Sequence, residues 1–130
     1  MRATVFLVLS VALTGCGVSM MDIRPLAVSI TPEPAVFEQL QTIARSRGYT
    51  IVDADGAQGV FAIDAQRRAR PAETVRFTVR CYRNGFAEVV PSGPRVERRG
   101  NILHLPRSVG EEYRDLVAAM HATLSPGVSR

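Results

Sequence analysis

The sequence predicts an α+β fold: a two-layer sandwich in which two amphipathic helices pack on one face of a mostly antiparallel sheet of four to five strands. Two observations predict it. Apolar residues recur at helical spacing in residues 31–47 and 108–124, and they alternate with polar residues in strand-like segments between these two. A chain of 130 residues is long enough for one domain that needs no disulfide framework.

The predicted domain begins with a short strand and a helix. Residues 26–30, LAVSI, alternate in polarity and are expected to form the strand. Thr31 is expected to cap the helix, Pro32 to occupy its first position, and Gly48 to end it after Arg47. The expected buried stripe of this helix has four apolar members: Val36, Leu40, Ile43 and Ala44.

A hairpin and a loop are expected next. Residues 49–53 and 60–65 are the predicted strands, and Asp55-Gly56 with Gly59 marks the turn between them. The stretch DADG at residues 53–56 is similar to the start of a calcium-binding loop, but its glycine comes two positions early and no glutamate closes the frame. The pattern therefore favours a plain turn. Residues 66–71, QRRARP, are expected to be a loop.

The clearest strand signal lies in residues 74–90, where polarity alternates on both sides of Asn84-Gly85. A two-residue loop would place the Glu88 carboxylate beside Cys81 on the core face. A three-residue loop with Gly85 in the left-handed conformation avoids this burial, so we prefer it. The preferred register gives four cross-strand pairs: Cys81 with Ala87, Val79 with Val89, Arg80 with Glu88, and Tyr82 with Phe86. In either register Cys81 points inward, as a small buried hydrophobe.

The last part of the domain contains two short strand candidates, residues 95–98 and 102–105, and a second helix. Ser108 and Glu111 have the spacing of a capping box at the start of this helix. Its expected apolar stripe has five members: Tyr113, Leu116, Val117, Met120 and Leu124. The domain is thus expected to span residues 26–125, and residues 126–130 are expected to be a loose tail.

The N-terminus has the layout of a secretory signal peptide. Arg2 is followed by the apolar run Ala3–Leu13, and the sequence LTGC then ends at Cys16. This segment resembles the signal peptide and lipobox of bacterial lipoproteins, in which an aliphatic residue, a small residue and Gly or Ala precede the acylated cysteine. The resemblance implies a signal peptide over residues 1–15, cleavage between Gly15 and Cys16, and a lipidated tether over residues 16–25.

The resemblance also implies a location. A lipidated Cys16 with more than one acyl chain would be a stable membrane anchor. Since Gly17 rather than Asp follows the cysteine, the sorting rule of Gram-negative lipoproteins points to the periplasmic face of the outer membrane. Two other interpretations of Cys16 stay open: a disulfide with Cys81 in an oxidising compartment, or a buried thiol in an uncleaved anchor.

The sequence offers no candidate catalytic or metal-binding pattern. The two histidines, His104 on a strand with its side chain facing solvent and His121 beside the apolar stripe of the last helix, have no second ligand at a metal spacing. No nucleophile elbow and no phosphate-binding glycine loop is present in the sequence. The net charge of +4 is a mild excess without an aromatic-studded basic motif, so nucleic acid is not an expected partner. We expect no enzyme, no metal and no cofactor.

The sequence is therefore compatible with two functions. The first is a lipid-anchored, non-enzymatic accessory or assembly subunit of an envelope complex. The second is a binder of an anionic envelope ligand, either lipopolysaccharide or a phospholipid headgroup. The second would use four residues on the exposed face of one strand: Arg76, Thr78, Arg80 and Tyr82. The simpler interpretation of these four is a solvated polar face in which Arg80 pairs with Glu88 across the hairpin.

Overall fold

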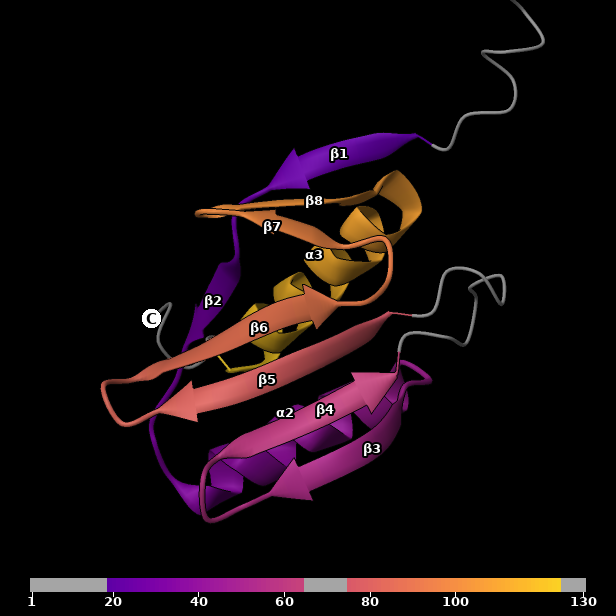
Figure 1. The fold of residues 1–130 in the computed structure, drawn as a ribbon. Helices are drawn as coiled ribbons and strands as arrows, with labels where there is room; N and C mark the ends of the chain where they lie inside the picture. Colours follow the sequence, from indigo (N-terminus) through magenta and orange to yellow (C-terminus); the bar gives the residue numbers. More distant parts are fainter. Residues whose placement is uncertain (1–18, 65–74, 125–130) are drawn as a thin grey trace, which may run out of the picture.

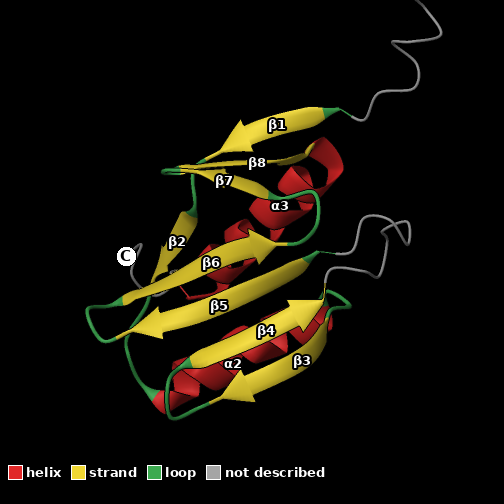
Figure 2. Ribbon diagram, in the orientation of Figure 1, coloured by secondary structure: helices red, strands yellow, loops and turns green. Residues whose placement is uncertain are grey.

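The structure is a computed structural model that describes residues 19–64 and 75–124. It contains two helices and two antiparallel sheets, and is therefore α+β (Figures 1 and 2). The elements follow the chain in this order: β1 (Met20–Ile23), β2 (Leu26–Ser29), α2 (Pro34–Ser46), β3 (Thr50–Asp55), β4 (Val60–Asp64), β5 (Arg76–Tyr82), β6 (Phe86–Ser92), β7 (Glu97–Arg99), β8 (Ile102–Pro106) and α3 (Arg107–Leu124).

The strands form two sheets, which corrects the expectation of one. The larger sheet has the order β2-β6-β5-β4-β3 and the smaller has the order β1-β8-β7. Prolines explain the division, because a proline has no N–H to donate to a neighbouring strand. Pro25 separates β1 from β2, while Pro91 and Pro94 lie at the end of β6 and after it. The larger sheet, with five antiparallel strands, agrees in size with the expected sheet of four to five strands, and the smaller sheet was not expected.

The strand β1 corrects a second expectation, because residues 16–25 are not all tether. Met20–Ile23 pairs with β8, with Met20 opposite Pro106 and Ile23 opposite Leu103, and Met21 and Ile23 are buried. Four residues are too few for a reliable periodic signal, and the partner strand lies about eighty residues further along the chain. The domain therefore starts by residue 20 and not at residue 26. Residues 16–18 of the expected tether, and the predicted signal peptide at residues 1–15, lie outside the described residues.

Helix α2 begins later than expected, at Pro34. Glu33 precedes it with an extended backbone (φ −143°, ψ 156°), and no side chain caps the helix. The proposed Thr31 cap is wrong because a residue that precedes a proline avoids the helical conformation, so Glu33 cannot continue a helix begun at Pro32. Pro34 suits the first position because a proline lacks the N–H that would have no partner there, and its fixed φ is already helical. The predicted end at Gly48 (φ 89°) and the buried stripe are confirmed: Val36, Leu40, Ile43 and Ala44 are all buried.

The hairpin of β3 and β4 confirms the plain turn. The Asp55 carboxylate accepts hydrogen bonds from the backbone N–H groups of Ala57 and Gln58, at 3.1 and 3.3 Å, which uses it in the turn itself. The pairing shifts by one residue between Ile51 and Asp53, so β3 contains a bulge. Residues 66–71, the expected loop, lie outside the described residues.

The hairpin of β5 and β6 has the three-residue loop and the register that the sequence favoured. All four predicted cross-strand pairs are present, and Gly85 has the left-handed backbone (φ 96°). Phe77, Val79, Ala87 and Val89 are fully buried. Keeping the Glu88 carboxylate out of the core was therefore a sufficient criterion for choosing the register.

Helix α3 follows β8 without a loop, so the predicted capping box is wrong. Ser108 and Glu111 lie inside the helix, whose first residue is Arg107. The Arg107 N–H donates to the Ser19 carbonyl oxygen at 2.9 Å, which satisfies one of the N–H groups at the start of the helix. The apolar stripe is confirmed: Tyr113, Leu116, Val117 and Met120 are buried, and Leu124 is partly buried against the core. Residues 125–130, including the expected tail, lie outside the described residues.

The core lies between the helices and the strands, and Tyr113 connects its parts. Helix α3 contacts β1, β2 and β8, and α2 contacts β3 and α3. The Tyr113 hydroxyl donates to the Val89 carbonyl oxygen at 2.6 Å and accepts from the Leu26 N–H at 2.6 Å. Leu26 and Val89 are partners in the β2–β6 register, so one hydroxyl of α3 bridges two strands near the place where the sheets separate.

Candidate functional site

The four residues predicted to bind an anionic ligand lie together on one face of β5. Arg76, Arg80 and Tyr82 are exposed and Thr78 is half-buried, while the residues between them point into the core. The prediction that these side chains share an outward face is confirmed. Their proposed role in binding is not tested by their position.

Neighbouring strands supply acidic groups to the same face. Arg76 lies between Asp64 of β4 and Ser92 of β6, and Arg80 lies between Val60 and Glu88. Among residues 19–64 and 75–124, neither the Arg76 nor the Arg80 guanidinium forms an ion pair or a hydrogen bond. The expected Arg80–Glu88 ion pair is therefore absent from the described part of the chain. Glu88 instead accepts a long hydrogen bond of 3.5 Å from the Tyr82 hydroxyl.

The spacing of the two arginines limits what this face can bind. Residues four apart on a strand have Cα atoms about 13 Å from each other, so each guanidinium would contact a different anionic group. The Glu88 carboxylate beside Arg80 also weakens the local positive potential. The arrangement suits a surface with several separated anions better than a single phosphate.

A pair of exposed aromatic side chains ends this face at the tip of the β5–β6 hairpin. Tyr82 is 41% exposed and its cross-strand partner Phe86 is 47% exposed. In the described part of the chain only Val52, on the edge strand β3, is a third large hydrophobic residue with comparable exposure. Sequence reasoning placed Tyr82 opposite Phe86 but did not single out Phe86, since exposure at a hairpin tip depends on what the rest of the fold leaves uncovered.

A depression of about 630 Å³ lies beside this tip. It is lined by the start of α2, by the turn between β3 and β4, and by Cys81, Tyr82 and Arg83. Its apolar lining includes Ile30, Phe37 and Cys81, and its charged lining includes Glu33, Glu38 and Arg83. We call Tyr82, Phe86 and this depression the tip surface. Sequence reasoning missed the depression, because three segments that are distant along the chain form it.

Close backbone contacts hold these segments together. The Cys81 N–H donates to the Gly59 carbonyl oxygen at 2.7 Å, and the Ile30 N–H donates to the Gly85 carbonyl oxygen at 2.9 Å. Gly59 has φ +64°, and a Cβ at this position would lie 3.1 Å from the Cys81 carbonyl oxygen. Only glycine therefore fits without strain where the β3–β4 turn approaches β5.

Cys81 borders the depression from the core side. It is half-buried, packs against the core as predicted and is a free thiol within the described residues. Burial raises the pKa of the Cys81 thiol above its ordinary value, which keeps the thiol protonated near neutral pH. A protonated thiol is a poor nucleophile, so the geometry favours a packing role for Cys81.

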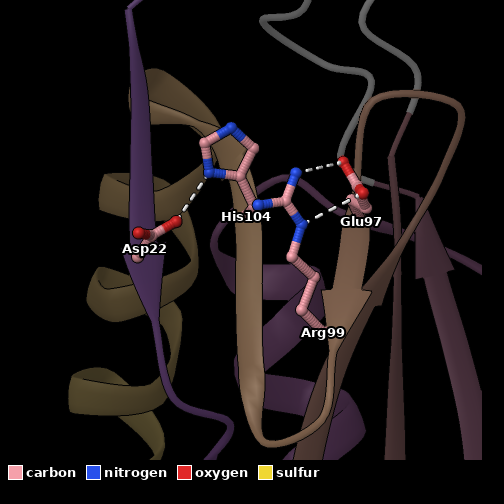
Figure 3. A network of polar contacts seen from close by, with 4 residues as sticks. All are labelled: Asp22, Glu97, Arg99 and His104. Atoms are coloured by element: carbon pink, nitrogen blue, oxygen red, sulfur yellow. Dashed lines mark hydrogen bonds and ion pairs between the residues drawn. The ribbon is translucent and has the colours of Figure 1, made fainter.

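A network of charged side chains lies on the outer face of the smaller sheet (Figure 3). Asp22, His104 and Glu97 are register partners on β1, β8 and β7. The His104 Nδ1 lies 2.6 Å from an Asp22 carboxylate oxygen, and Arg99 contacts Glu97 through two nitrogens at 3.1 and 3.3 Å. Hydrogen bonding and charge attraction from Arg99 lower the pKa of Glu97. We call these four residues the charged network.

The charged network changes the expectation for His104, whose side chain was predicted to face solvent. That side chain is 32% exposed and is bonded to a carboxylate 82 residues away, so it is a paired surface group. Nothing in the sequence around either residue signals the pairing. His121, the other histidine, is exposed in the last turn of α3. Within residues 19–64 and 75–124, no three His, Cys, Asp or Glu side chains are placed to hold a metal ion.

No protein family matches the chain, and no curated protein matches it in sequence. Of the helices that the structure describes, neither is long and apolar enough to span a membrane. Gly15, Cys16 and the rest of the lipobox lie outside the described residues.

Proposed function

We propose that the protein is a lipid-anchored, non-enzymatic accessory subunit of an envelope complex, held at the periplasmic face of the outer membrane by Cys16. The sequence LTGC and the following Gly17 support the anchor and its location. The partner protein docks on the tip surface.

The single observation that supports docking is the exposed aromatic pair beside a depression. Aromatic side chains are enriched at the centres of protein interfaces, where they fill pockets of the partner. Tyr82 and Phe86 are each exposed over nearly half of their surface, whereas 22 other hydrophobic residues of the described chain are buried. The depression next to them offers the complementary feature, a cavity that a partner side chain fills.

The finer architecture belongs to the same proposal. Helices α2 and α3 form one layer over one face of the larger sheet, which leaves the opposite face, with Arg76 and Arg80, to solvent. Two features support this two-layer arrangement: α2 contacts α3, and both helices lie behind the strands in the view of Figure 1.

Two experiments test the proposal. The first is metabolic labelling with palmitate: the parent and a Cys81→Ser variant incorporate label, and a Cys16→Ser variant does not. Label retained by the Cys16→Ser variant would disprove the assigned anchor site.

The second experiment is co-purification from detergent-extracted native membranes. The double variant Tyr82→Ala/Phe86→Ala is expected to lose at least tenfold of a partner that the parent retains, since interface aromatics often contribute about 2 kcal/mol or more each. Val52→Ala is the matched control, because Val52 is equally exposed but lies on the far edge of the sheet. Equal recovery by parent and double variant would disprove docking at the tip.

The second candidate function is binding of an anionic envelope ligand through Arg76, Thr78, Arg80 and Tyr82. Two guanidinium groups without an ion-pair partner in the described chain favour it. Replacing Arg76 and Arg80 with Gln is expected to weaken binding of the non-lipidated domain to vesicles that contain phosphatidylglycerol, most clearly at low salt. The matched control replaces Arg45 and Arg114, two exposed arginines of the helices, with Gln. Equal losses in both double variants would show a general charge effect and rule out a site on β5.

A further inference from the structure

The point at which the chain enters the domain is fixed at one end of the molecule. Ser19, the first described residue, receives two hydrogen bonds from Arg107, the first residue of α3. The Arg107 N–H donates to the Ser19 carbonyl oxygen at 2.9 Å, and Arg107 Nε donates to Ser19 Oγ at 3.3 Å. Met20 then pairs with Pro106 as β1 begins. The first strand is therefore held directly against β8 and α3.

This position leaves a very short connection to Cys16. Three peptide units join the Cα atoms of Cys16 and Ser19, and a fully extended chain spans at most about 3.6 Å per residue, or about 11 Å in total. A domain of about 100 residues has a radius of gyration of about 13 Å. The connection is therefore shorter than the radius of the body that it holds, so a lipid on Cys16 would restrict which side of the domain can face the membrane.

The tip surface lies at the other end of the molecule. In Figure 1, β1 begins at the upper right, and the β5–β6 turn is at the lower left. The N-terminal segment runs between these places: β1 pairs with β8, β2 continues along β6, and Ile30 reaches the turn by donating to Gly85. Each of these two strands has four residues and extends about 13 Å. A connection of about 11 Å therefore keeps the Ser19 end close to the membrane, while the tip lies at the far end of β2.

We infer that the end formed by Ser19, Pro106 and Arg107 faces the lipid surface, and that the tip surface points away from this membrane. The inference rests on the proposed lipid anchor at Cys16. It adds to the proposed function in one respect: the aromatic pair does not insert into the anchoring bilayer. Its partner is a protein domain on the aqueous side, at a distance from the membrane set by the length of the domain.

The test uses the full lipidated chain in vesicles of phosphatidylethanolamine and phosphatidylglycerol that carry a headgroup quencher. Cys81→Ser removes the free thiol, and one reporter thiol is added by Ser108→Cys next to Arg107 or by Asn84→Cys at the tip, both at exposed positions. A fluorophore at position 108 is expected to be quenched several times more than one at position 84. Equal quenching, or stronger quenching at position 84, would overturn the inference while leaving the anchor in place.

Two further outcomes separate the inference from its basis. If mass spectrometry finds no acyl chain on Cys16, the anchor fails and the inference fails with it. Inserting ten Gly and Ser residues after Gly17 lengthens the connection by about 17 Å on average, which should reduce the difference between the two positions. An unchanged difference would mean that surface contacts, and not the short connection, orient the domain, and would overturn the argument.

Discussion

The tip surface and the charged network are both on the outside of the molecule, but their side chains differ in one respect. In the charged network Asp22 pairs with His104, and Glu97 pairs with Arg99. On the face that leads to the tip surface, the Arg80 guanidinium forms no ion pair within the described residues, and two aromatic rings remain exposed. Charged groups that pair with each other need no second protein to satisfy their hydrogen bonds. Exposed aromatic rings beside a depression are removed from water only when another molecule covers them. This difference supports the docking proposed for the tip surface and gives no such support for the charged network.

The largest effect on stability is expected at the junction between the two sheets. Tyr113→Phe removes the hydroxyl that bridges the Leu26 N–H and the Val89 carbonyl oxygen, which leaves two backbone groups without that partner. The Val89 carbonyl is buried and the Leu26 N–H is half-buried. Leaving a buried polar group unsatisfied costs about 1–3 kcal/mol, and urea unfolding of the variant should show a loss in this range. Tyr49→Phe is the control and should lose less, because the Glu112 carboxylate that accepts from Tyr49 is only half-buried. A loss no larger than that of the control would contradict the bridging role.

The same hydroxyl predicts a dependence on alkaline pH. Burial raises the pKa of Tyr113 to about 12, above its ordinary value of 10.0. The folded state therefore holds this proton more tightly than the unfolded state, so its contribution to stability is complete below pH 10 and is lost as the pH rises toward 12. Urea unfolding across this pH range should show a steeper decline for the parent than for Tyr113→Phe. Parallel declines would contradict the raised pKa.

A smaller loss of stability is expected where the β3–β4 turn meets β5. Gly59→Ala places a Cβ 3.1 Å from the Cys81 carbonyl oxygen in a left-handed backbone, and that conformation alone costs about 1–2 kcal/mol for other residues. Gly100→Ala is the matched control, with φ +61° but no atom within 4 Å of the added Cβ. The Gly59→Ala variant should be the less stable of the two, and should bind the partner more weakly because the wall of the depression shifts. Equal stability would show that the close approach has no cost.

The charged network should contribute little stability and no docking. His104→Gln removes the pair with Asp22, and exposed pairs of this kind contribute about 0–1 kcal/mol. The expected result is a small fall in the urea midpoint that shrinks further at 1 M salt, with unchanged recovery of the partner. Loss of the partner from this variant would break the comparison between the two surfaces.

The smallest effect on stability is expected for the two arginines on the outward face of β5. Arg76→Gln/Arg80→Gln should change the free energy of unfolding by no more than about 0.5 kcal/mol, as is usual for surface substitutions. Neither guanidinium has a bond to lose within the described residues. A clearly larger loss would show that these arginines stabilise the fold and would remove them from the candidate site.

Local patterns in the sequence predicted much of the fold. The buried stripes of both helices follow from their spacing, and the β5–β6 register follows from keeping Glu88 out of the core and from Gly85 in the turn. What failed depends on distant partners. The sequence does not signal that residues 20–23 pair with β8, or that the Arg107 N–H at the start of α3 donates to the Ser19 carbonyl oxygen.

In the candidate site too, local features could be predicted from the sequence and features that depend on distant segments could not. The outward face of Arg76 to Tyr82 could be predicted, because alternation within one strand determines it. The exposure of Phe86, the depression and the Asp22–His104 pair could not be predicted, since each is set by which segments the folded chain brings together. For Tyr82, the outward direction of the side chain could be predicted, but its place at the edge of a depression could not.

The central claim, that the tip surface docks a partner and the charged network does not, is tested most directly by site-specific photo-crosslinking in intact membranes. A photoreactive amino acid is placed at Phe86, at His104, or at Val52 as an exposed control. We predict one dominant cross-linked product from position 86 that disappears when Tyr82→Ala is added, and none above background from positions 104 and 52. A product from position 104 that equals or exceeds the product from position 86 would contradict the claim.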